Sequence, residues 1–557
     1  MTLQAPNTAP ADAISEEGNS LPLEAVEQYG TPQCARFRKK IFRRHPSLSQ
    51  TLAREYLLIA ERVGYRTANC ALRDADLELR LGNTGLSAAC GDEEIAEYAK
   101  AKSRNMERDF TAIVQRTSLD IALDWAIDAV TQAGLTFPLD GNHRGNREKE
   151  LSAMARVCAP EWWRRQLRPL AARKLEHFYR SRGYVSRHKS PYISRQGLAR
   201  HQSRSRRNRR TLADLEVLSN EGDVLNLAEV ADASVSNPEL RRNELMTRLN
   251  GYEGIAQVMG FEGLFLTLTC PSKYHPVHSG TGRPNKRYNG TTPREAQDYL
   301  NAVWATIRAA WHRAGIRVFG FRIAEPHHDG TPHWHLLVFI NPDDAPLAWE
   351  IFRTKALAED GDERGAQERR AVLERIDPNK GSAAGYIAKY ISKNIDAVGV
   401  GTDFETGAPG ASGAQAAVAW ASTWGIRQFQ PIGNTSVTVW RELRRLRDAL
   451  PHCCPEKLEA IRAAADAGDW ATFVELMGGA LVSRDGQTLR AWMVTKEEEN
   501  AYAETVERIK GVVMRGTKLA AHFQLPTRTK TWSVRTMQST ESWPNAPPHR
   551  GGLDLCQ

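Results

Sequence analysis

Two histidines separated by one bulky apolar residue are the clearest candidates for chemistry in this chain. They are His333 and His335, in the run PHWHLLVFI. Residues two apart on a β-strand point to the same face, so both imidazoles would lie side by side while Trp334 packs on the opposite face. Two imidazoles in this arrangement supply half of a divalent-cation site.

The strand before the histidines supplies a third candidate ligand. The run IRVFGFRIAE predicts a strand that ends near Glu325, and PHHDGTP predicts the turn to the histidine strand. In such a hairpin Glu325 lies opposite, or nearly opposite, the histidines, and its carboxylate oxygens suit Mg²⁺ or Mn²⁺. We interpret His327 and His328 as residues of the turn. The hairpin therefore predicts a site for a divalent metal.

Two tyrosines, Tyr386 and Tyr390, follow in the run GYIAKYISKN. Four residues apart on a helix, they share one face and stand about 6 Å apart along its axis. A phenol, with a pKa of about 10, is a poor nucleophile near neutral pH, and a divalent cation on the phosphate would help its attack. Attack would leave a 5′-phosphotyrosine that stores the bond energy for rejoining. Lys389 and Lys393 share an adjacent face and could lower the phenol pKa or hold phosphate.

Each motif has a simpler interpretation when it is taken alone. Most His-x-His pairs are surface or packing residues, and most tyrosine pairs at this spacing pack a helix. The combination favours chemistry, because the Gly/Ser-rich entry GSAAG brings the tyrosine helix in beside the candidate metal hairpin.

The elements around these motifs predict an α+β fold. We expect a strand over 261–270, a helix from Pro293 to Gly315, the hairpin, a charged helix around 346–375, and then the tyrosine helix. Beyond about 440 the pattern is mainly helical.

Composition allows several domains and a polyanionic partner. The 557 residues include 75 Lys+Arg and 66 Asp+Glu, a net charge of +9 and a pI near 9.1, which supports nucleic-acid binding without proving it. No apolar run is long enough to span a membrane. The polar N-terminus does not resemble a secretory signal, and eight cysteines without a CxxC pair suit reduced thiols. We expect a protein of the cytoplasm of the cell that makes it.

A basic segment precedes the candidate catalytic region. The run HKSPYISRQGLARHQSRSRRNRR contains no acidic residue, so it can neutralise phosphates, and its alternative interpretation is a solvated linker. The candidate DNA-binding residues are Arg204, Arg206, Arg207, Arg209 and Arg210.

The pattern along the chain predicts six regions. They are a disordered N-terminus at 1–24, a helical N-terminal domain at 25–190, a basic arm and helical connector at 191–260, a catalytic domain at 261–400, a mainly helical C-terminal region at 401–525 and a disordered tail at 526–557.

Three segments, in this order, resemble the motifs of the HUH endonucleases, named for His-hydrophobic-His. LFLTLTCPSKYHP resembles their strand-forming motif, EPHHDGTPHWHLLVF their metal motif, and GYIAKYISKN a double-tyrosine motif. The chain is more closely similar to the two-tyrosine replication initiators of phages, the replication gene A protein family. CAPEWWRRQLR and VAWASTWGIRQFQPIGNTSVTVWRELRRL extend the resemblance over about 150–480.

The resemblance implies both a fold and an activity. The domain at 261–400 would be an HUH nickase domain, a central antiparallel β-sheet flanked by helices, with mainly α-helical regions on either side. It would nick single-stranded origin DNA with Mg²⁺, or Mn²⁺, to start rolling-circle replication, and later join the displaced strand. A Walker GxxxxGK[ST] run is missing from the sequence, so we expect a host helicase to unwind the DNA and the host replisome to extend the 3′ end.

Three alternative functions would each explain part of these sequence features. A two-tyrosine HUH transposase or a plasmid relaxase would use the same chemistry on a mobile element. A metal-dependent phosphohydrolase would use water and form no covalent adduct with DNA. A DNA-binding protein without catalytic activity would rest on the arginine run and would not need His333.

Overall fold

The computed structural model describes residues 22–537 except 378, 380, 404–406, 408, 434, 497 and 516–521. The chain forms two compact units. The first contains the described residues of Met1–Tyr184, Pro276–Lys286 and Glu497–Val506, and the second those of Val185–His275, Arg287–Lys496 and Glu507–Gln557. Most of the expected disordered N-terminus (1–21 of 1–24) and most of the expected tail (538–557) lie outside the described residues, and the finer domain limits stay predictions.

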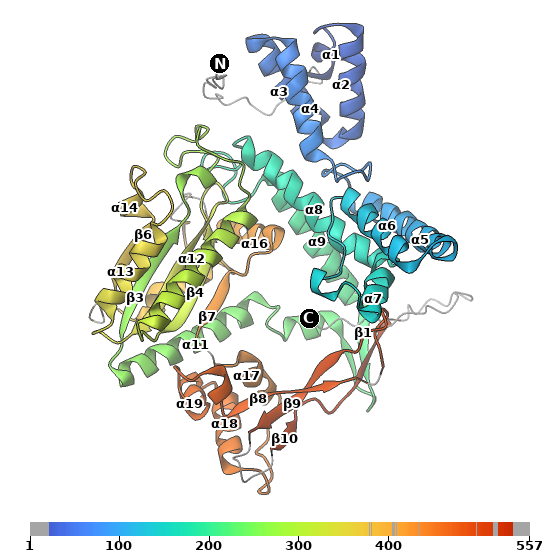
Figure 1. Ribbon diagram of the computed structural model, residues 1–557. Helices are drawn as coiled ribbons and strands as arrows, with labels where there is room; N and C mark the ends of the chain where they lie inside the picture. The colour runs from blue at the N-terminus through green and yellow to red at the C-terminus, as the bar shows by residue number, and fades with distance from the viewer. Residues whose placement is uncertain are drawn as a thin grey trace. The chain divides into compact units, whose positions relative to one another are not determined.

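The first unit is mainly helical (Figure 1), and its buried apolar side chains form a core of their own. Its packed side chains come mainly from the inward stripes of amphipathic helices, spaced at three and four residues. The α-helices are α1 (Pro22–Val26), α2 (Pro32–Arg44), α3 (Ser49–Val63), α4 (Tyr65–Leu79), α5 (Asp92–Arg116), α6 (Leu119–Gln132), α7 (Arg147–Val157) and α8 (Pro160–Ser181).

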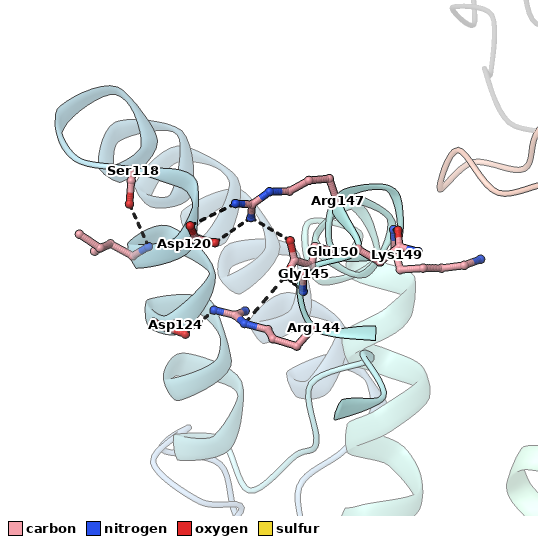
Figure 2. A network of polar contacts seen from close by, with 10 residues as sticks. Ser118, Asp120, Asp124, Arg144, Gly145, Arg147, Lys149 and Glu150 are labelled. Atoms are coloured by element: carbon pink, nitrogen blue, oxygen red, sulfur yellow. Dashed lines mark hydrogen bonds and ion pairs between the residues drawn. The ribbon is translucent and has the colours of Figure 1, made fainter. Parts of the chain in front are cut away.

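Ion pairs hold α6 against α7 in this unit (Figure 2). Arg147 donates to both carboxylate oxygens of Asp120, at 2.7 and 3.1 Å, and to Glu150 at 2.9 Å. Arg144 pairs with Asp124 at 2.6 Å. The Glu150 side chain is almost fully buried, so these bonds offset the cost of removing its charge from water.

The second unit is built around an antiparallel sheet in the order β6-β3-β5-β4-β7. Its strands are β3 (Glu262–Thr269), β4 (Phe319–Pro326), β5 (Pro332–Ile340), β6 (Ala371–Arg375) and β7 (Phe429–Ile432). The predicted first strand and the predicted hairpin are confirmed. The histidine strand β5 is the middle strand, and all of its residues are buried, which explains why apolar residues occupy it almost continuously.

Helices cover both faces of this sheet. Trp334, Leu336 and Val338 of β5 pack on one face with α12 (Pro293–Arg313), α13 (Ala345–Ala356) and α16 (Gly410–Trp424). Leu337 and Phe339 pack on the other face with α11 (Pro238–Met259), α15 (Ala383–Lys393), α17 (Val437–Leu443), α18 (Glu456–Ala467) and α19 (Trp470–Leu476). His333 and His335 share the parity of Leu337, so they lie on the face of the tyrosine helix α15, and Trp334 faces away as predicted.

The predicted charged helix over 346–375 is wrong in its second half. The chain forms α13, then a short helix α14 (Ala366–Arg369), and residues Ala371–Arg375 form β6. Leu266 of β3 pairs with Leu373, and Thr267 pairs with Val372. Pairing with a neighbouring strand overrides the helix preference of the charged residues around them.

The C-terminal prediction also needs correction, because the region beyond 440 contains strands of two different sheets as well as helices. Strands β8 (Leu489–Thr495), β9 (Glu507–Met514) and β10 (Phe523–Pro526) form one sheet. Strand β11 (Trp532–Thr536), in the expected disordered tail, pairs with β1 (Leu215–Ser219), which also pairs with β2 (Val224–Asn226). The remaining helices of this unit are α9 (Arg195–Ala213) and α10 (Leu227–Asp232).

In the described part of the chain, the helices are too short or too polar to span a bilayer. The protein is therefore an α+β protein whose described helices do not cross a membrane.

We expect Gly320→Ala to lower the free energy of unfolding by about 1–3 kcal/mol. Gly320 has a φ of +152° in β4, and a Cβ there would overlap the carbonyl oxygen of Leu337 on β5. Thermal unfolding followed by circular dichroism measures the effect. Gly254→Ala in α11 is the matched control, because its added Cβ meets no atom within 4 Å and alanine favours a helix. An unchanged melting temperature for Gly320→Ala would contradict the close approach of the two strands.

Candidate active site

Three buried side chains on the β4–β5 hairpin converge into a candidate metal site. Glu325 of β4 pairs directly across the ladder with His333 of β5. The Nε2 atoms of His333 and His335 are 3.0 Å apart, and Oε2 of Glu325 is 4.0 and 3.9 Å from them. The three residues form the only such cluster of possible metal ligands found among the described residues.

Electrostatics keep both imidazoles neutral, which is the form that binds metals. Burial, followed by the Lys393 and Lys389 charges, lowers the pKa of His335 to about 3. Burial, followed by neighbouring histidines, holds the pKa of His333 well below its usual value. Nδ1 of His335 lies 3.1 Å from the Thr267 hydroxyl. When Nδ1–H donates to this oxygen, Nε2 keeps its lone pair and can bind a metal ion.

These donors fit one divalent cation. Adjacent ligands of a six-coordinate ion with bonds of about 2.1 Å stand about 3 Å apart. The two Nε2 atoms match this spacing, and Oε2 of Glu325, 4.0 and 3.9 Å from them, would move closer when an ion binds. Nδ1 of His333 is buried without a hydrogen-bond partner among the described residues. Hydrogen bonds to its ring therefore do not explain why this polar side chain is buried. Two imidazoles and one carboxylate could therefore hold a metal ion, and the three candidate ligands lie on the two predicted strands.

A second group of buried side chains holds Glu325, and the sequence analysis missed most of it. Asn394, just past the end of α15, donates its amide to Oε1 of Glu325 and also to the carbonyl of Tyr390 at 2.8 Å. Gln428 donates to the Asn394 carbonyl at 3.1 Å. Burial raises the pKa of Glu325, while the Lys393 charge and the Asn394 bond oppose that rise.

Lys393 is buried between carboxylates, which differs from the expected contact with phosphate. Its Nζ lies 3.5 Å from Glu325 and 3.7 Å from Asp403. Asp403 in turn accepts a hydrogen bond of 2.6 Å from the hydroxyl of Tyr192. Tyr192 is buried with a φ of +72°, a conformation that a non-glycine residue adopts only when its surroundings hold it. Lys393 therefore balances buried negative charge in this geometry.

The tyrosine helix begins where its free N–H groups are capped. Ser382 caps α15 through the N–H of Gly385 at 2.9 Å, and Glu253 of α11 accepts from Ala383 and Ala384 at 2.7 and 3.1 Å. A carboxylate at a helix N-terminus satisfies these donors and complements the helix dipole. These contacts fix the start of α15 and with it the position of the tyrosines.

The two tyrosines have different neighbours. The ring of Tyr390 lies 4.5 Å from the His335 ring, centroid to centroid, and 6.2 Å from the Tyr386 ring. The hydroxyl of Tyr386 donates to Glu374 on β6. Phe265 of β3 contacts His335 and both tyrosines, with ring centroids 4.7 to 5.3 Å away. Tyr390 is therefore the tyrosine adjacent to the candidate metal site.

Both phenols are harder to ionise than free tyrosine. Burial and the Glu374 carboxylate raise the pKa of Tyr386 to about 12. Burial, with the nearby Tyr386, Glu325 and Glu374, also raises the pKa of Tyr390. The exposed Lys389 places its Nζ 4.5 Å from the Tyr386 ring centroid and 5.1 Å from that of Tyr390. This ammonium lies beside both phenols, and its effect on them stays a prediction.

The basic segment forms helix α9, and its arginines are not equivalent. Arg209 makes a bidentate ion pair with Asp232, with both distances 2.6 Å, and Arg204 donates to Ser422 at 2.7 Å. Arg206, Arg207 and Arg210 are exposed. A hollow of about 490 Å³ lies along α9 and α16, and it is lined by Arg206, His201, Gln202, Gln415 and Ile395. One lining residue, Ile395, directly follows Asn394 in the chain.

The turn histidines have contacts that the sequence analysis did not foresee. His327 stacks on His333 with ring centroids 4.0 Å apart. His275 pairs with Asp329 at 2.8 Å and contacts the His327 ring at 5.3 Å. His327 therefore packs against the candidate ligand His333, and His275 and Asp329 lie behind His327. The only early signal was the unusual density of histidines in EPHHDGTPHWH.

Comparison with known proteins gives the family. The bacteriophage replication gene A protein (GPA) family matches residues 94–398, more than half of the chain. The chain belongs to this family. The matched residues include the three candidate metal ligands and both tyrosines, so the phage gene A family shares the segment that carries the site.

Curated members of this family are similar over long segments. The replication gene A protein of Escherichia phage 186 is 42% identical over 388 residues, 69% of this chain and 56% of the relative. That of Escherichia phage P2 is 41% identical over 396 residues, 69% and 52%. A probable replication endonuclease from a prophage-like region of Salmonella typhi is 35% identical over 444 residues, 77% and 54%. The chain thus spans about half the length of these relatives. The search of solved structures returned no match.

We expect His333→Ala, His335→Ala and Glu325→Gln each to weaken Mn²⁺ binding by more than about 100-fold. Each changes a candidate ligand itself, and loss of a residue that only hydrogen-bonds to a ligand already costs about 10- to 100-fold. Isothermal titration with Mn²⁺ measures the affinity. His312→Ala, at an exposed histidine in the last turn of α12, is the control and should bind as wild type. Equal affinities in all four variants would exclude this metal site.

We expect Asn394→Ala to weaken Mn²⁺ binding by about 10- to 100-fold. The variant keeps all three ligands but leaves Oε1 of Glu325 without its amide donor. The same titration measures the loss, and circular dichroism shows whether the fold is intact. A folded Asn394→Ala protein with wild-type affinity would show that Asn394 does not position Glu325.

Proposed function

We propose that this chain is a site-specific single-strand DNA endonuclease and ligase that initiates rolling-circle replication of phage DNA. The observation that carries the proposal is the pairing of a buried Glu325–His333–His335 cluster with Tyr390, whose ring lies 4.5 Å from that of His335. Family membership supports a role in phage DNA replication. A hydrolytic nuclease would not need a second tyrosine one helical turn away.

The proposed reaction is a transesterification. The hydroxyl oxygen of a tyrosine bonds to the phosphorus, the bond from phosphorus to the 3′ oxygen breaks, and the phenol proton ends on the released 3′-hydroxyl. Glu325, His333 and His335 would hold a divalent cation, Mg²⁺ or alternatively Mn²⁺, which polarises the phosphate. Lys389 offsets charge near the attacking oxygen, and the product is a 5′-phosphotyrosine whose reversal rejoins the strand.

The contacts of the two tyrosines favour an order of use. Tyr390 is adjacent to His335, whereas the hydroxyl of Tyr386 is held by Glu374. We assign the first cleavage to Tyr390. Tyr386, which shares the same helix face, would attack in the second round, when the 5′ end occupies Tyr390. Alternating nucleophiles release each other's product, which suits circularisation of a displaced strand.

The substrate strand would reach the site along α9. Arg206, Arg207 and Arg210 are exposed on this helix, and the hollow beside it begins next to Ile395. Single-stranded origin DNA is therefore the proposed substrate, and a host helicase and replisome are the proposed partners in the cytoplasm of a bacterial host cell. A transposase or relaxase with the same chemistry is the second candidate, because the site itself does not distinguish the biological context.

We expect Tyr390→Phe to reduce the initial covalent adduct by at least about 100-fold, and the double variant with Tyr386→Phe to abolish it, because only a phenol oxygen can form the ester. The substrate is a 3′-labelled pool of single-stranded DNA with a randomised centre, incubated with Mn²⁺ or EDTA. An adduct that survives boiling in detergent carries the label on the protein, and sequencing it gives the cleavage site.

Tyr502→Phe, in the first unit, is the matched control and should form the adduct normally. Cleavage that needs metal but gives the same products in the double variant would replace this proposal with hydrolysis by water. An adduct lost in Tyr386→Phe and kept in Tyr390→Phe would reverse the assigned order.

A further inference from the structure

Helix α2 of the first unit has an unusual charge composition. Its 13 residues, PQCARFRKKIFRR, include six basic side chains and no acidic one. The arginine-rich segment identified from the sequence forms α9. The proposed reaction uses no residue of α2. The charges of α2 therefore need their own explanation.

Two of the six cations point into the protein. Arg38 is 1% exposed and donates to the hydroxyl of Tyr56 at 3.0 Å and to the carbonyl of Tyr29 at 2.8 Å. Arg44 pairs with the buried Asp76 at 2.5 Å. These bonds fix the rotation of α2 about its axis, so they also determine which side chains face the solvent.

The other four cations form one exposed row, the α2 stripe, at positions i, i+3, i+4 and i+7. Its members, Arg36, Lys39, Lys40 and Arg43, are all exposed. Their side chains form no ion pair or hydrogen bond with the described residues. Like charges at these spacings cost about 0.2–0.5 kcal/mol per pair. Helix stability therefore does not account for the stripe.

We propose that the α2 stripe binds the sugar-phosphate backbone of duplex DNA. Seven residues of helix extend about 10 Å, which is the rise of about three phosphates along one strand. Phe37 and Phe42 pack against the core of the unit, so the stripe offers no aromatic platform of the kind that binds single strands. The apolar face of α2 is likewise used inside the unit, which argues against insertion into a lipid surface.

This binding function is separate from the metal and the tyrosines. The stripe and the candidate active site belong to one chain. Binding of the stripe to duplex DNA therefore raises the concentration, near the active site, of the single-stranded segment of the same DNA. Contacts to phosphate carry no base sequence, so the stripe adds affinity and salt dependence without adding specificity.

The test uses the full chain and a 30-base-pair duplex of arbitrary sequence, with fluorescence anisotropy measured over a range of salt. The variant changes Arg36, Lys39, Lys40 and Arg43 to glutamine. The matched control changes four exposed cations of α5 to glutamine, Lys100, Arg104, Arg108 and Arg116, two of which already pair with acids. A single strand of equal length and phosphatidylserine vesicles are the other two probes.

We expect the stripe variant to bind the duplex at least about tenfold more weakly at 0.1 M salt, with a salt slope shallower by about three to four, while the α5 control binds as wild type. The double variant Lys39→Gln/Lys40→Gln should show about half of that change in salt slope. It provides the test if the fourfold variant does not fold. Equal losses in both fourfold variants, an unchanged slope, or a loss seen only with single strands or vesicles would each overturn the proposal.

Discussion

The buried carboxylate of Glu325 is the constraint on which the candidate site depends. An ionised carboxylate away from water is costly unless cations and hydrogen bonds compensate it. Asn394 at Oε1 and Lys393 at Oε2 supply part of this compensation. His333 and His335 also face Oε2, where a divalent cation would complete it. The surrounding elements are arranged to keep these groups in contact.

The β4–β5 hairpin and helix α15 meet this constraint in different ways. The hairpin places Glu325 opposite His333 through backbone pairing, which leaves little freedom in their separation. The helix is placed by its capped N-terminus and by packing against Phe265. As a result Asn394 and Tyr390, four residues apart, both reach the site from one end of α15. The candidate nucleophile Tyr390 and the side chain that holds the candidate ligand Glu325 are therefore coupled through one short helix.

Much of the second unit was predictable because its signals are local. Alternation and length predicted β3, β4 and β5, and Pro293 predicted the start of α12. The prediction failed at Ala371–Arg375, where charged residues suggested a helix and pairing with β3 produced a strand. The strands after 440 were missed although LRAWMVT and ERIKGVVM are rich in strand-forming residues. For β6 the deciding partner is β3, about a hundred residues earlier, whereas β8, β9 and β10 pair with consecutive strands that the composition already favoured.

The sequence by itself determined the candidate ligands and nucleophiles, because strand and helix periodicity decide which side chains share a face. It could not determine which partners each charge would find. Only the tertiary structure placed Lys393 between two carboxylates, engaged Arg209 with Asp232, and left the α2 stripe exposed. It also made Tyr390 the neighbour of His335. The physical reason is that burial and charge pairing depend on how separate elements pack, which local sequence patterns do not encode.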